Sequence, residues 1–193
     1  MGARDDPPGR DRSVDLRPGR LAVVLALNGD AARLVDDVRE RWDRVMRGRI
    51  GAHVTLLHDV EDDDALPAAL TRVAGRPPIE LTLTSTACWG PLRYGIYLDI
   101  DDHTGAVAEL YEELAELESP RWRRTEYRPH VTLLHGRTVS EESAVRAWAE
   151  LQSWRPEHAA RIDAITVLRL GDDRWHEIER VPLGAPPASG PRR

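Results

Sequence analysis

The hydrophobic pattern of the chain alternates between two periods. Apolar residues run together over 21–27 and alternate with polar ones over 79–89. Both patterns predict strands, whose side chains point to opposite faces in turn. Over 30–44 the apolar residues recur every three or four positions, which predicts a helix. The expected buried face of this helix is Leu34, Val38, Trp42 and Val45.

The same two periods predict the remaining elements. Further helices are expected over 64–74, 104–118 and 140–152. Further strands are expected over 53–58, 94–100, 130–135, 161–170 and 175–183. Residues 1–19 and 184–193 are rich in Pro, Gly and charge and lack any period, so we expect disordered tails there. One domain over 20–183 remains.

One six-residue sequence, HVTLLH, occurs twice, at 53–58 and at 130–135. A predicted strand and helix precede each copy at similar spacing, which indicates an internal duplication with halves at about 21–89 and 94–170. The duplicated order predicts an α+β protein of two lobes related by an approximate two-fold axis. Two antiparallel-rich sheets would line a central cleft, with the helices outside.

The repeated sequence carries residues suited to acid-base chemistry. In a strand, His53 and Thr55 point to one face, and His130 and Thr132 do the same in the second copy. If the two-fold axis brings the strands together, the cleft holds two imidazoles and two hydroxyls. One imidazole can take a proton from an attacking water and the other can protonate a leaving oxygen, while the threonines donate hydrogen bonds to a phosphoryl group. We therefore expect phosphodiester chemistry without a metal.

The last histidine of each copy is harder to assign. Strict alternation places His58 opposite to His53, and His135 opposite to His130, which argues against chelation of one metal ion by either pair. We expect His58 and His135 at the rim of the sheet, where they either cap a lobe or help to bind phosphate.

The loop over 121–128 places four arginines among two aromatic residues, just before the second motif. A base can stack on Trp122 or Tyr127 while an arginine binds phosphate, and Arg128 is nearest to the motif. The alternative, a solvated loop with Trp122 over the core, stays open. Tyr97, on a strand expected to face the cleft, is another candidate for substrate binding, with structural packing as its alternative.

Composition limits the partners. The net charge of −6 argues against sequence-independent binding of duplex DNA, which requires a basic surface, but it permits a nucleotide or a single RNA end. No apolar run is long enough to span a membrane, and a single cysteine, Cys88, rules out an intrachain disulfide. We expect a cytoplasmic monomer.

The paired motifs resemble a known group of enzymes. Two His-x-Thr motifs in matching strands, with Arg128 and Pro129 ahead of the second, resemble the 2H phosphoesterase superfamily and its LigT-like branch of RNA 2′,3′-cyclic phosphodiesterases and 2′-5′ RNA ligases. The resemblance covers about residues 20–183. It implies no cofactor and no metal, and relatives often carry an arginine at the position of His135. The active site that it implies is His53, Thr55, His130 and Thr132, with His130 as the base and His53 as the acid.

The resemblance also implies a reaction. The expected enzyme is a hydrolase of RNA processing that opens a terminal 2′,3′-cyclic phosphate to a 2′-phosphomonoester, with 2′-5′ RNA ligation as a related activity. One alternative is a phosphodiesterase for another small cyclic phosphate, such as an ADP-ribose or nucleotide derivative. A second alternative is a module that binds RNA ends or nucleotides without catalysis.

Overall fold

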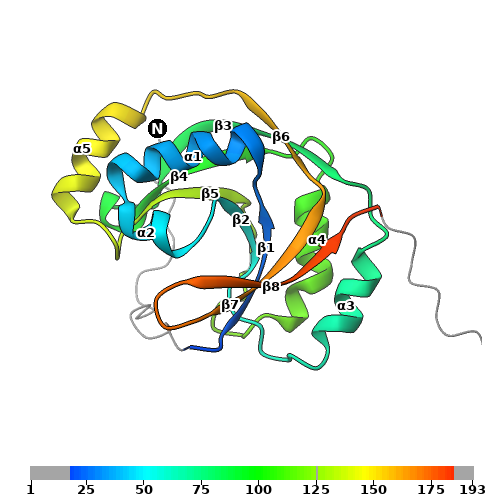
Figure 1. The fold of residues 1–193 in the computed structure, drawn as a ribbon. Coiled ribbons are helices and arrows are strands. Elements are labelled where there is room, and N and C mark those ends of the chain that lie inside the picture. The colour runs from blue at the N-terminus through cyan, green and yellow to red at the C-terminus, as the bar shows by residue number, and fades with distance from the viewer. Residues whose placement is uncertain (1–17, 125, 185–193) are drawn as a thin grey trace, which may run out of the picture.

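The computed structural model describes residues 18–124 and 126–184 (Figure 1). The predicted tails lie almost wholly outside this range. The strands are β1 (Leu21–Ala26), β2 (His53–Leu57), β3 (Ile79–Cys88), β4 (Gly95–Asp101), β5 (His130–His135), β6 (His158–Ile162), β7 (Ala164–Leu170) and β8 (Trp175–Pro182). The α-helices are α1 (Gly29–Trp42), α2 (Arg44–Arg49), α3 (Leu66–Val73), α4 (Ala106–Leu114) and α5 (Glu141–Leu151), and short 3₁₀ turns cover Leu92–Tyr94 and Ala115–Leu117.

The predicted α+β class is confirmed. All eight strands join one curled antiparallel sheet in the order β6-β3-β4-β5-β2-β1-β7-β8. The two sheets expected from the sequence are the two halves of this single sheet. They become continuous where β2 pairs with β5, the two strands that carry the repeated sequence.

The two sequence halves exchange strands. β3 follows the first copy of the repeat, yet it pairs with β4 and β6 in the second half of the sheet. In return β7, which follows the second copy, pairs with β1 in the first half. Neither half of the sheet is therefore built from one contiguous segment of chain.

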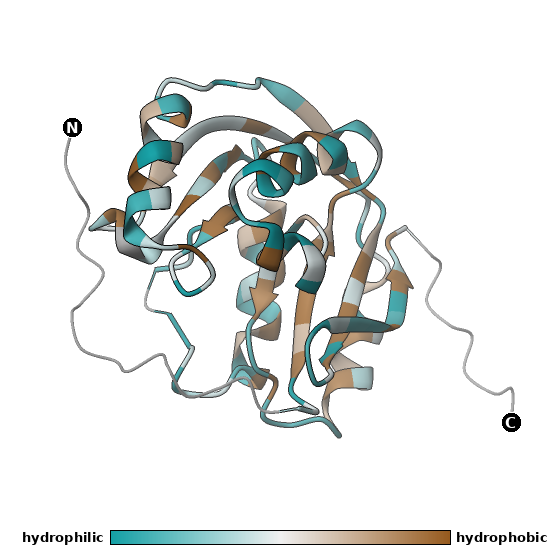
Figure 2. Ribbon diagram, turned by 60° about the vertical axis from the view of Figure 1, so that its left-hand side comes forward, coloured by the Kyte–Doolittle hydropathy of each residue, from teal (hydrophilic) through white to brown (hydrophobic). Residues whose placement is uncertain are grey.

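The helices gather in two groups on the sheet. In Figure 1, α1, α2 and α5 lie together on one side, and α3 lies beside α4 on the other. Each main helix packs against the repeated strand of the other half, α1 against β5 and α4 against β2. Figure 2 shows the apolar residues concentrated on the strands and on the inner sides of the helices. The core includes Leu25, Leu57, Leu83, Leu98, Leu110 and Leu134.

The helix predicted over 30–44 ends early. Asp43 leaves the helical conformation and caps a separate helix, α2, by accepting a hydrogen bond of 2.9 Å from the Met46 N–H. The predicted burial of Val45 is wrong, because this residue is 47% exposed on α2. The fully buried row of α1 is instead Ala31, Val35 and Arg39, and the predicted Leu34, Val38 and Trp42 are only partly buried beside it.

The strand predicted over 161–170 is two strands. β6 ends at Ile162 and β7 begins at Ala164, and the two pair at opposite ends of the sheet order, with β3 and with β1. Asp163 is thus the point where the chain crosses from one half of the sheet to the other. Hydrophobic alternation does not mark such a crossing, because the chain continues in extended conformation from β6, which is buried on one face, into β7, which is buried almost throughout.

One glycine fixes the pairing of β4 with β5. Gly95 lies opposite His135 with φ of +127°, and a Cβ atom added there would lie 2.5 Å from the carbonyl oxygen of Leu134. Real Cβ atoms do not come so close to backbone, so only glycine fits this position.

Gly95→Ala should therefore destabilise the protein by about 2 kcal/mol or more, because it combines an unfavourable φ with a backbone clash. Unfolding in urea, followed by circular dichroism, measures the change. Gly48→Ala is the matched control, since it lies in α2 with open space around it and should be neutral or slightly stabilising. Equal stabilities for the two variants would contradict the packing constraint at Gly95.

Candidate active site

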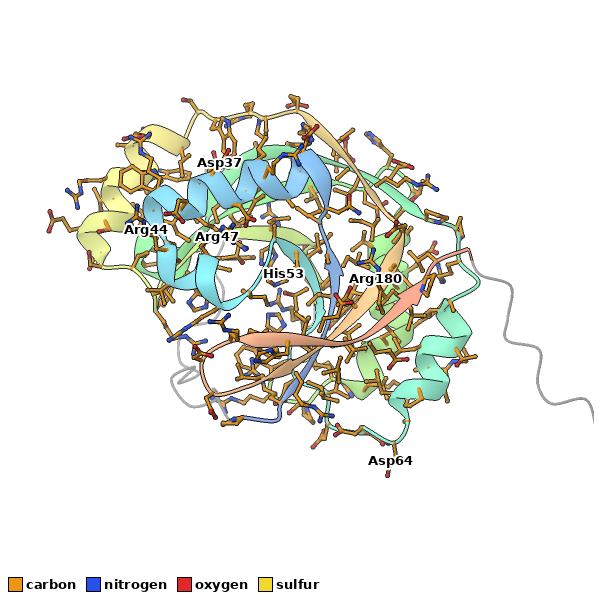
Figure 3. All side chains as sticks on the ribbon, viewed as in Figure 1. Asp37, Arg44, Arg47, His53, Asp64 and Arg180 are labelled. Carbon is orange, nitrogen blue, oxygen red and sulfur yellow. The ribbon has the colours of Figure 1, made fainter. Side chains whose placement is uncertain are left out.

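The junction between β2 and β5 brings the predicted catalytic residues together. Val54 lies opposite Val131 across this antiparallel pair. Residues on either side of that pair step in opposite directions, so His53 lies across from Thr132 and Thr55 from His130. All four are partly exposed, whereas the two valines between them are fully buried. In Figure 3 His53 is seen near the middle of the molecule, between α2 and the β7–β8 hairpin.

Each repeated strand contains a β-bulge. In β2, Thr55 pairs with Val24 but Leu57 pairs with the adjacent Val23, which leaves Leu56 as the extra residue. In β5, Thr132 pairs with Tyr97 and Leu134 with Ile96, which leaves Leu133 as the extra residue. A bulge of this kind shifts the alternation of side chains by one position.

The bulges change the positions of His58 and His135. The prediction that these residues lie on the face opposite to His53 and His130 is wrong, because one extra residue in each strand returns them to the same face. Burial agrees: both copies read partly exposed, buried, partly exposed, buried, buried, partly exposed. The site face therefore carries four histidines and two threonines.

Hydrogen bonds fix the tautomer of both central histidines. The Nδ1 atom of His53 lies 2.7 Å from the Gly51 carbonyl oxygen, and the Nδ1 atom of His130 lies 2.9 Å from the Arg128 carbonyl oxygen. A carbonyl oxygen only accepts, so each Nδ1 carries a proton and donates it. The Nε2 atom of each neutral ring is then the basic nitrogen.

Both rings are neutral at pH 7. Burial lowers the pKa of His53 to about 3, and the positive charge of Arg39 contributes to this shift. Burial also lowers the pKa of His130 to about 3, with contributions from Arg124, His58 and Arg128, although the hydrogen bond to the Arg128 carbonyl acts in the opposite direction. The Nε2 atoms of both rings are thus unprotonated in the unliganded protein.

The carbonyl groups of the two threonines are held by side chains from the opposite half. Arg39 on α1 is fully buried, and its Nη2 and Nε atoms donate to the Thr132 carbonyl oxygen at 2.6 and 3.2 Å. In the other half, the Tyr127 hydroxyl donates to the Thr55 carbonyl oxygen at 2.8 Å. Both carbonyls adjoin a bulge, where ladder bonding is disrupted, so these donors satisfy them.

A second pair of crossed contacts holds the outer histidines. Asp43, at the end of α1, accepts a hydrogen bond of 2.9 Å from the His135 backbone N–H. Glu118, which directly follows the 3₁₀ turn after α4, accepts one of 2.7 Å from the His58 backbone N–H. Both carboxylates are buried, and burial raises the pKa of Glu118 to about 7.

Two of the predicted candidates, Tyr97 and Arg128, lie beside His130 together with Trp89. Trp89 and Tyr97 stack on each other and both meet the His130 ring edge-on, at centroid distances of 4.8 and 5.3 Å. Tyr97 is buried, which agrees with packing. Arg128 lies over the Tyr97 ring and forms an ion pair of 2.6 Å with Asp99.

Trp122 and Tyr127 each stack on a protein ring. Trp122 lies parallel to His58 at 5.2 Å, and Tyr127 lies parallel to Tyr111 at 4.0 Å. His135 accepts a hydrogen bond of 3.2 Å at Nδ1 from the Arg137 N–H. This contact places the proton of the neutral His135 ring on Nε2.

Sequence reasoning missed three residues that shape the site. They are Arg39, Asp43 and Glu118. Arg39 continues the apolar row of Ala31 and Val35 at four-residue spacing. A charged residue in such a row is the feature of the sequence that could have identified it. Asp43 and Glu118 each follow the helix of their repeat, so comparison of the halves could have found them.

Two negative findings apply to the described residues, 18–124 and 126–184. No group of three or more His, Cys, Asp or Glu side chains there is arranged to hold a metal ion. In the same ranges, no helix has the length and apolar character needed to cross a membrane.

The lowered pKa values predict the behaviour of the two rings in solution. His53 and His130 should stay neutral, with the proton on Nδ1, as the pH falls from 8 to 5 in the folded protein. In the urea-unfolded protein both should titrate near ~6.5. Nitrogen-15 NMR of labelled histidine measures both states. A folded-state titration near neutral pH for either ring would contradict the assignment.

Comparisons with known proteins place the chain in a family. A family model described as the 2′-5′ RNA ligase superfamily matches residues 28–174. A search of curated proteins finds no match.

Solved structures share the fold. Escherichia coli LigT in its apo form is 21% identical, with a TM-score of 0.59 over 87% of this chain and 99% of LigT. The protein TT0787 of Thermus thermophilus is 17% identical, with a TM-score of 0.59 over 86% and 98% of the two chains. Usb1 of Kluyveromyces marxianus is 13% identical, with a TM-score of 0.55 over 88% and 100%. The chain therefore belongs to the 2′-5′ RNA ligase superfamily, within the 2H phosphoesterases that its paired His-x-Thr motifs resemble.

Proposed function

We propose that this protein is a metal-independent phosphodiesterase that opens 2′,3′-cyclic phosphates of RNA ends or nucleotides to 2′-phosphomonoesters. The observation that carries the proposal is the Val54–Val131 register, which sets His53 across from Thr132 and His130 across from Thr55. Two imidazoles and two hydroxyls on one face form a set that can act on both sides of a phosphoryl group. Solved complexes of Escherichia coli LigT with 3′-AMP and with ATP fit a nucleotide substrate.

The proposed reaction needs only water as a second reactant. The Nε2 atom of His130 removes a proton from water while the water oxygen attacks phosphorus. The bond between phosphorus and O3′ breaks, and the Nε2–H of protonated His53 delivers its proton to O3′. The product carries a 2′-phosphate and a free 3′-hydroxyl, and the hydroxyls of Thr55 and Thr132 donate to the phosphoryl oxygens as charge develops.

Substrate binding itself supplies the protonated acid in this scheme. In the unliganded protein both rings are neutral, because burial lowers their pKa values to about 3. A bound phosphate anion favours the charged imidazolium and raises the pKa of the ring beside it. We expect His53 to take up a proton as the substrate binds, while His130 stays neutral and basic.

The remaining predicted residues have supporting roles in the proposal. His135 lies on the site face with its Nδ1 atom accepting from the Arg137 N–H, and we assign its ring to phosphate binding. Tyr97 and Trp89 hold the His130 ring, and Arg128 is oriented by Asp99 beside Tyr97. Because Trp122 and Tyr127 already stack on His58 and Tyr111, we assign them to the architecture of the site rather than to base stacking.

Replacing either central histidine should strongly reduce turnover. His53→Ala and His130→Ala should each lower kcat for 2′,3′-cyclic nucleotides by about 10²-fold or more, because each removes a proton-transfer group. EDTA should leave the wild-type rate unchanged. Release of 2′-nucleotide, followed by chromatography, measures the rates, and His103→Ala, an exposed histidine outside the site, serves as the control.

Three outcomes would contradict this proposal. Loss of activity in EDTA would argue for a metal, and full activity in either alanine variant would place the chemistry elsewhere. Binding of the cyclic nucleotide without any hydrolysis would favour a binding module.

A sulfur substitution separates the two histidine roles. When O3′ of the cyclic phosphate is replaced by sulfur, the leaving thiolate needs no proton, since a thiol pKa of ~8.5 lies far below that of an alcohol. His53→Ala should then act on this substrate within about tenfold of the wild-type rate, whereas His130→Ala should stay impaired. Rescue of His130→Ala instead would reverse the acid and base assignments.

A further inference from the structure

A row of three polar side chains extends from the core to the active-site face. Glu118 is buried, and its Oε1 atom lies 3.6 Å from Nδ1 of His58. On the other side of the His58 ring, Nε2 lies 3.3 Å from Nη2 of Arg124. The row thus runs from Glu118 through His58 to Arg124, and none of these residues takes part in the proton transfers proposed above.

The chemistry of these groups fixes the direction of the row. A guanidinium group only donates hydrogen bonds, so Nε2 of His58 must accept from Arg124. The proton of the His58 ring then lies on Nδ1, facing the Glu118 carboxylate. His58 is therefore neutral in this arrangement. Its ring does not neutralise the positive charge of Arg124.

The position of His58 is fixed on several sides. The bulge at Leu56 places it on the face of His53, its backbone N–H donates to Glu118, and its ring lies parallel to Trp122. The backbone N–H of Arg124 also donates to the Tyr111 hydroxyl at 3.1 Å. A long, flexible arginine is thus held at two points beside a rigid ring.

Arg124 is close enough to His130 for its charge to act there. Its positive charge opposes protonation of His130, and it ranks ahead of Arg128 in this effect. The two arginines differ in their partners: Arg128 forms a close ion pair with Asp99, whereas the ring that Arg124 contacts is neutral. Arg124 is therefore the better placed of the two to meet an incoming anion.

We propose that Arg124 binds the phosphoryl oxygens of the substrate, and that His58, held by Glu118, is the residue that positions Arg124. The ligand class is a phosphate ester at the end of a nucleotide or RNA, so this inference rests on the proposed function. A guanidinium suits it, because its planar fork can donate two hydrogen bonds to one phosphoryl group.

The first experiment removes the charge. Arg124→Ala should raise KM for 2′,3′-cyclic nucleotides by about 10- to 100-fold, the loss expected for hydrogen bonds to a charged group, and should weaken binding of inorganic phosphate in calorimetry by a similar factor. Arg123→Ala is the matched control. It removes the same charge from the same loop, but its guanidinium donates to the Glu116 carbonyl oxygen, and both measurements should stay near wild type.

The second experiment tests positioning. His58→Gln keeps an acceptor near the position of Nε2 and should retain most of the affinity for phosphate. His58→Ala should lose as much phosphate affinity as Arg124→Ala does. The double variant His58→Ala with Arg124→Ala should be no weaker than Arg124→Ala alone, because His58 acts through that arginine. Additive losses would mean that His58 and Arg124 act independently and would overturn the positioning role.

The inference and the proposed function fail in different ways. If wild type hydrolyses cyclic nucleotides but Arg124→Ala and Arg123→Ala have equal KM and equal phosphate affinity, the role of Arg124 is overturned and the phosphodiesterase proposal stands. If wild type hydrolyses none of them, the proposed function fails. Phosphate binding that is lost in Arg124→Ala but kept in Arg123→Ala then still supports Arg124 as the anion site.

Discussion

The antiparallel contact between β2 and β5 is the constraint on which the rest of the structure depends. It joins the two halves of the sheet, and the buried Val54–Val131 pair at its centre sets which polar groups face one another. A slip of one residue would turn both histidines into the core. Neighbouring features disfavour such a slip. The bulges fix the register of β2 on β1 and of β5 on β4, and Gly95 admits no side chain against β5.

Hydrogen bonds from side chains of one half to the backbone of the other half stabilise this junction. Arg39 and Asp43 come from the first half and bind the strand of the second, while Tyr127 and Glu118 do the reverse. A buried polar group is costly unless it is paired, so the loss of any of these side chains would leave its backbone partner without that hydrogen bond. The face of each strand that carries the histidines is thus shaped by residues that come from the opposite repeat.

The sequence was sufficient for the main features and insufficient for two kinds of detail. Repetition and alternation together identified the fold class and placed His53 and His130 on one face with their threonines. Alternation misplaced His58, because a bulge is a backbone feature, and its only trace was the adjacent pair Leu56 and Leu57, both buried. Arg39 escaped notice for a related reason: a charged residue on an apolar row is normally assigned to solvent, and here its partner is a carbonyl brought close only by the tertiary fold.

The exchange of β3 and β7 between the halves has a consequence for how such a molecule can be assembled. A chain of half this length, with the same order of elements, could complete its sheet only by lending its last strand to a second copy and borrowing one in return. Two such copies would form a strand-swapped dimer in which the histidines of both copies meet at the symmetry axis. In the present chain the two halves are covalently connected, so they need not associate from solution. The site then forms within one polypeptide, whereas in the dimer its formation would depend on protein concentration.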